Sequence, residues 1–83
     1  MHEAGIAERM LEVVLERAAA AGAGRVTVVE LEAGDACGVS DEAIRFHWAE
    51  VARGTRAADA DLRILVTDDA TALRVAAIEV VDA

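Results

Sequence analysis

The sequence predicts an α+β domain: a two-layer αβαββ arrangement with a three-stranded mixed sheet and two helices on one face. Apolar residues recur at helical spacing near the N-terminus, and three later segments alternate as strands do. The length, 83 residues, allows one domain only. We therefore expect residues 1–83 to form a single domain.

Two helices are expected. The first covers about Glu3–Ala21, with an apolar stripe on one face and glutamates on the opposite side, and glycines end it. Its stripe contains Ile6, Met10, Val13 and Val14, and its acidic side contains Glu8, Glu12 and Glu16. The second helix starts at the N-cap Ser40 and closes at Gly54. Its apolar arc contains Ile44, His47, Trp48 and Val51, with Phe46 off the arc.

Three strands are expected, at Arg25–Ala33, Asp61–Thr67 and Leu73–Val81. The first two flank the second helix, so a right-handed crossover would make them parallel. The short link between the last two predicts an antiparallel hairpin. The apolar pattern of the last strand changes parity, and a β-bulge near Ala76–Ala77 would return its apolar side chains to one face.

Composition excludes several functions. The net charge of −8 argues against nucleic acid as a partner, because phosphates repel such a chain. The single cysteine, Cys37, rules out an internal disulfide and a cysteine-rich zinc site, so zinc is not expected. No apolar run is long enough for a membrane span or a signal peptide, which predicts a cytoplasmic protein. We expect no enzyme, since acid–base pairs and phosphate-binding glycine loops are missing.

The one group with metal-binding chemistry is Met1, His2 and Glu3. A histidine at position 2 lets the α-amine, the His2 amide nitrogen and the imidazole reach one ion, and Glu3 can supply a fourth donor. Such a planar nitrogen and oxygen set suits Ni(II) or Cu(II). Histidine at position 2 also preserves Met1, because methionine is normally trimmed before small residues. Since histidine at this position also occurs by chance, the residues alone leave the metal site open.

Several short stretches, taken in order along the chain, resemble the motifs of a known protein family. They are Met1-His2-Glu3 with Ile6-Ala7, Arg25-Val26-Thr27 through Leu31-Glu32, Gly34-Asp35 with Gly38-Val39, Phe46 through Arg53-Gly54-Thr55, and Leu73-Arg74-Val75 with Ile78-Glu79-Val80. Together they resemble the HypA/HybF family of hydrogenase nickel-incorporation metallochaperones. The resemblance implies that Met1, His2 and Glu3 bind Ni(II), with His2 as the key ligand. It implies a maturation GTPase and the large subunit of a nickel enzyme, hydrogenase or urease, as partners.

The chain departs from the family in one respect. The family carries a cysteine-rich zinc module between the last two strands, whereas a short turn joins Val66 to Leu73 here. Binding of nickel is therefore better supported than its delivery. A metal-independent interaction or regulatory domain that docks on the GTPase or another partner stays open, as does an accessory subunit unrelated to nickel.

The remaining reactive residues favour structural roles. His47 lies within an apolar arc, which is typical of a packed or edge histidine, and Asp41 suits the positive end of the second helix. No base adjoins Cys37, so a catalytic thiol is not expected. The apolar arc of the first helix is wider than one sheet needs, and the last strand follows a very short turn. Both features leave a homodimer open.

Overall fold

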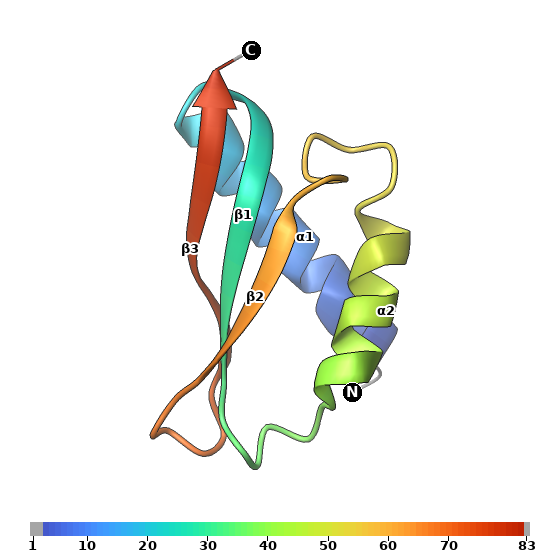
Figure 1. Cartoon of the computed structure of the whole chain (residues 1–83), viewed down its shortest axis with the longest axis vertical. Helices are drawn as coiled ribbons and strands as arrows, with labels where there is room; N and C mark the ends of the chain where they lie inside the picture. The colour runs from blue at the N-terminus through green and yellow to red at the C-terminus, as the bar shows by residue number, and fades with distance from the viewer. Residues whose placement is uncertain (1–2, 83) are drawn as a thin grey trace.

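The computed structural model describes residues 3–82. Its elements are α1 (Glu3–Ala20), β1 (Ala23–Ala33), α2 (Asp41–Val51), β2 (Asp61–Val66) and β3 (Leu73–Asp82). Both helices lie on one face of a three-stranded sheet, and the other face is uncovered (Figure 1). The predicted αβαββ, two-layer α+β architecture is therefore confirmed.

Strand β1 occupies the middle of the sheet, in the order β2-β1-β3. Strands β1 and β2 run parallel, as the crossover through α2 predicts, and β3 pairs with β1 in the antiparallel sense. The predicted β2–β3 hairpin is wrong, because β1 separates these strands. When extended, the link 67–72 spans at most about 20 Å. Strands β2 and β3 are two strand spacings apart, about 10 Å, so the link is long enough to connect them across β1.

The link crosses the C-terminal end of β1 and is hydrogen-bonded to it. The Gly34 amide donates to the Ala72 carbonyl at 2.9 Å, and the Ala36 amide donates to the Ala70 carbonyl at 2.7 Å. A side chain at residue 34 would overlap the carbonyl oxygens of Asp69 and Ala70. Glycine at this position is therefore what lets the chain pass over the end of β1.

A bulge in β3 keeps its apolar residues on the helical side. Glu30 pairs with Ala77 and Leu31 pairs with Val75, so Ala76 is an extra residue in β3. This confirms the predicted bulge. Side chains on both sides of the bulge pack against the core, namely Leu73, Val75, Ile78 and Val80.

The core lies between the helices and β1. The buried residues of α1 fall on one stripe: Ala7, Met10, Val14 and Ala18. They face β1, where Val26, Val29 and Leu31 have no exposed surface. Helix α2 adds Ile44 and Trp48, which are 2% and 4% exposed. Neither helix in residues 3–82 has the length and apolarity to cross a bilayer.

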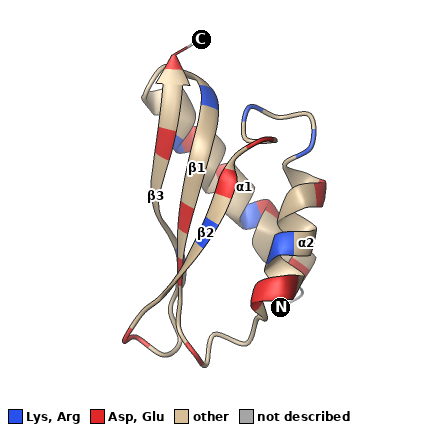
Figure 2. Ribbon diagram, viewed as in Figure 1, with Lys and Arg blue, Asp and Glu red and all other residues tan. Residues whose placement is uncertain are grey.

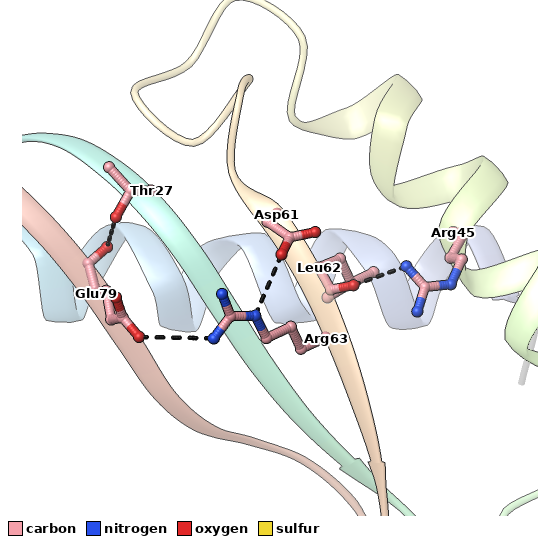
Figure 3. A network of polar contacts seen from close by, with 6 residues as sticks. All are labelled: Thr27, Arg45, Asp61, Leu62, Arg63 and Glu79. Carbon is pink, nitrogen blue, oxygen red and sulfur yellow. Dashed lines mark hydrogen bonds and ion pairs between the residues drawn. The ribbon is translucent and has the colours of Figure 1, made fainter.

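A polar bridge lies on the open face of the sheet, whose three strands carry more acidic than basic residues (Figure 2). Arg63 on β2 reaches Asp61 with Nε at 3.2 Å and Glu79 on β3 with Nη1 at 3.8 Å (Figure 3). To do so it crosses β1 at Val28, whose register partners are Asp61 and Glu79. Val28 is only 6% exposed although no helix covers this face.

Substituting Gly34 tests the crossing. Gly34→Ala should lower the free energy of unfolding by about 2 kcal/mol, because the new Cβ meets backbone atoms that cannot move independently. The matched control is Gly5→Ala in α1, where a Cβ meets nothing within 4 Å. That substitution should stabilise the helix by about 0.5–1 kcal/mol. Urea unfolding measures both, and equal effects would contradict the crossing at Gly34.

Candidate metal centre

The predicted ligands lie at the start of the chain, and the structure describes one of them. Glu3 is the first residue of α1 and is half-buried. Met1 and His2 fall outside the described residues. An acidic residue in the first turn suits the positive end of a helix.

Helix α2 packs beside the start of α1 and helps to hold it in place. The two helices pack against each other, and both begin at the same end of the molecule (Figure 1). Ser40 is the N-cap of α2, as predicted: its Oγ accepts a hydrogen bond from the Ala43 amide at 3.1 Å. The cap fixes where α2 begins, and Ile44 and Trp48 then anchor the helix in the core.

Asp41 is engaged within its own helix. Its Oδ1 accepts a hydrogen bond from Arg45 Nε at 2.6 Å, one turn further along α2. Arg45 Nη1 also donates to the Leu62 carbonyl of β2 at 2.7 Å (Figure 3). Asp41 therefore acts at the helix start, as predicted, and Arg45 ties α2 to the sheet. Arg45 was not among the residues predicted from the sequence, although its spacing of four residues from Asp41 is typical of such a pair on a helix.

His47 and Cys37 have protein partners. His47 is half-buried, with Nδ1 3.3 Å from Glu50 Oε1, and its ring packs edge-on against Phe46 at 5.2 Å. This agrees with the predicted edge histidine. The Cys37 thiol donates to the Val39 carbonyl at 3.7 Å. Across residues 3–82, no three His, Cys, Asp or Glu side chains come together as a metal site.

Comparison with known proteins identifies the family. The profile described as "Hydrogenase/urease nickel incorporation, metallochaperone, hypA" matches residues 1–77. The chain belongs to the HypA family. The hydrogenase maturation factor HypA of Chlorobaculum tepidum is 39% identical over 64 residues, which are 77% of this chain and 57% of that protein. The HypA of a Roseiflexus species is 44% identical over the same share of this chain, and 52% of its own length is matched.

A solved structure supports the fold. The solution structure of the Ni metallochaperone HypA from Helicobacter pylori superposes with a TM-score of 0.88 at 12% identity, covering 100% of both chains. The chain spans about half the length of the curated relatives it matches. Between β2 and β3 it has only the link 67–72.

Removing the N-cap of α2 tests how much Ser40 stabilises the helix that packs beside the start of α1. Ser40→Ala should lower the free energy of unfolding by about 1 kcal/mol, because the Ala43 amide loses its acceptor. Ser40→Asp restores an acceptor and should retain most of the stability. Thermal unfolding of the two variants measures the difference. No loss in Ser40→Ala, or an identical loss in both variants, would show that the hydrogen bond to the Ala43 amide does not stabilise α2.

Proposed function

We propose that this protein is a nickel-binding metallochaperone that assists maturation of a nickel enzyme. The observation that carries the proposal is the family match, which begins at residue 1 and so includes Met1, His2 and Glu3. The ion is cargo, bound for transfer to another protein. The ligands proposed for it are the same three residues.

The start of α1 supports this ligand set. The first amide groups of a helix have no partner within it, and α1 begins at Glu3. The Glu3 amide is therefore not committed to the helix. Together with the α-amine, the His2 amide and the imidazole, it gives a planar nitrogen set for Ni(II). Binding releases protons from these groups, so nickel affinity should fall as the pH is lowered.

Delivery of nickel to a partner protein is the second part of the proposal, and it rests on fewer observations than nickel binding does. The matching family profile names hydrogenase and urease as recipients of nickel, so the partners proposed are a maturation GTPase and the large subunit of such an enzyme. One cysteine cannot build the family's zinc module, and zinc is not proposed as a ligand. A cytoplasmic location fits these partners.

A second candidate function is a metal-independent interaction domain. It is favoured by one observation, that only the link 67–72 joins β2 to β3, at the place where the family's zinc module would lie. Under this alternative the domain docks on a maturation GTPase without metal. Light scattering of the two proteins mixed in the presence of a chelator separates the candidates. A stable complex without nickel supports the alternative, and a complex that forms only with Ni(II) contradicts it.

The nickel site is tested by histidine substitution. His2→Ala should weaken Ni(II) binding by at least about 100-fold, since one planar donor and its chelate ring are lost. His47→Ala is the matched control, because His47 lies on α2 beside Glu50, and it should leave nickel affinity unchanged. Isothermal titration of the untagged chain measures both. Equal affinity of the two variants would overturn the ligand assignment.

The α-amine is tested separately. Acetylation of the N-terminus, or a tag of several residues before Met1, should abolish tight binding, because the chelate requires a free amine within reach of the His2 amide and imidazole. Extension at the C-terminal end is the control and should have no effect. Retained nickel affinity after N-terminal blocking would rule out this coordination mode.

A further inference from the structure

A groove of about 440 Å³ lies between α1 and the start of β3. Its floor is apolar and consists of Ile6, Met10, Val13, Leu73 and Val75. Ile6, Val13 and Leu73 pack against the core but stay half-exposed. The apolar stripe of α1 therefore extends beyond what the sheet and α2 cover.

The rim of the groove is basic in an otherwise acidic protein. The chain has 8 basic residues against 16 acidic ones, and Arg9, Arg17 and Arg74 all line this groove. Arg74 is paired with Glu32 at 2.7 Å. Arg9 has only a 4.0 Å contact with Glu12, and Arg17 forms no ion pair within residues 3–82. Two guanidinium groups on α1 are therefore available to a ligand.

The shape of the groove favours a helix as its occupant. From Ile6 to Arg17 the groove follows α1 for about 16 Å, which is about three helical turns. A helix laid in such a groove places apolar side chains at helical spacing on the floor. Its carboxylates on the side that faces α1 would meet Arg9 and Arg17.

We propose that the groove between α1 and β3 binds an acidic amphipathic helix of a partner protein. The apolar face of that helix covers Met10 and Val13, and its Asp and Glu side chains pair with Arg9 and Arg17. This goes beyond nickel binding and does not depend on it, since Glu3, the one proposed nickel ligand that the structure describes, does not line the groove. An ion pair between a carboxylate and a guanidinium group at the rim of the groove adds specificity and speeds association.

The test uses two dye-labelled helical peptides and the full chain with chelator present. Both peptides carry leucines at helical spacing; one has glutamate and the other lysine at the flanking positions. Fluorescence anisotropy should show saturable binding of the glutamate peptide, at least about tenfold tighter than the lysine peptide. The affinity should fall as salt is raised. Equal affinity for the two peptides would overturn the proposal.

Charge reversal locates the site. The double variant Arg9→Glu/Arg17→Glu should lose the glutamate peptide and gain the lysine peptide. The matched control, Arg25→Glu/Arg53→Glu, reverses two exposed arginines that do not line the groove and should bind as the original chain does. Circular dichroism checks that both variants fold. If the two double variants behave alike, the groove is not the binding site.

Two other occupants give distinguishable results. Saturable binding of dodecanoate, with no binding of either peptide, would mean a site for small amphipathic carboxylates and would overturn the helix proposal. Light scattering that shows a dimer, lost in Arg9→Glu/Arg17→Glu and kept in the control variant, would mean that a second copy fills the groove. Because no step involves metal, failure here leaves the nickel proposal standing, and failure of nickel binding leaves this one standing.

Discussion

The central position of β1 is the constraint on which the rest of the structure depends. Within residues 3–82 it alone is paired with a strand on each side, and its Val26, Val29 and Leu31 are fully buried against the helices. With β1 in the middle, the crossover through α2 places β2 on one side, and β3 must take the other. The chain then has to pass over the end of β1, and it does so at Gly34. The central position of β1 therefore determines where the later strands β2 and β3 lie.

The same arrangement positions the start of α1. The buried stripe of α1 packs on the sheet and against α2, and α2 is held by its Ser40 cap and by Arg45, which reaches the Leu62 carbonyl of β2. Glu3 therefore begins a helix whose direction is fixed by the core. Nickel ligands at the start of such a helix, as proposed for Met1, His2 and Glu3, would bind and release an ion without any change in the core.

Much of the fold followed from periodicity, and the exceptions have physical causes. The helices, the strands and the bulge at Ala76 were predicted because each leaves a spacing or a parity break in the apolar pattern. The strand order was not, because a short link is compatible with a hairpin and with a crossing alike; Gly34 was the overlooked signal. The site at His2 came from covalent geometry and resemblance, and its ligand set stays a prediction. The wide apolar arc of α1 was noted, but only the packing shows that Ile6 and Val13 border a groove.

The central proposal is a nickel ion held in a square plane by the first residues of the chain. Nuclear magnetic resonance of the untagged, isotopically labelled protein with one equivalent of Ni(II) tests this most directly. Planar four-coordinate Ni(II) is diamagnetic, so we expect sharp spectra with shifts confined to the start of α1 and the neighbouring end of α2. Paramagnetic broadening, or changes centred on His47 or Cys37, would contradict it.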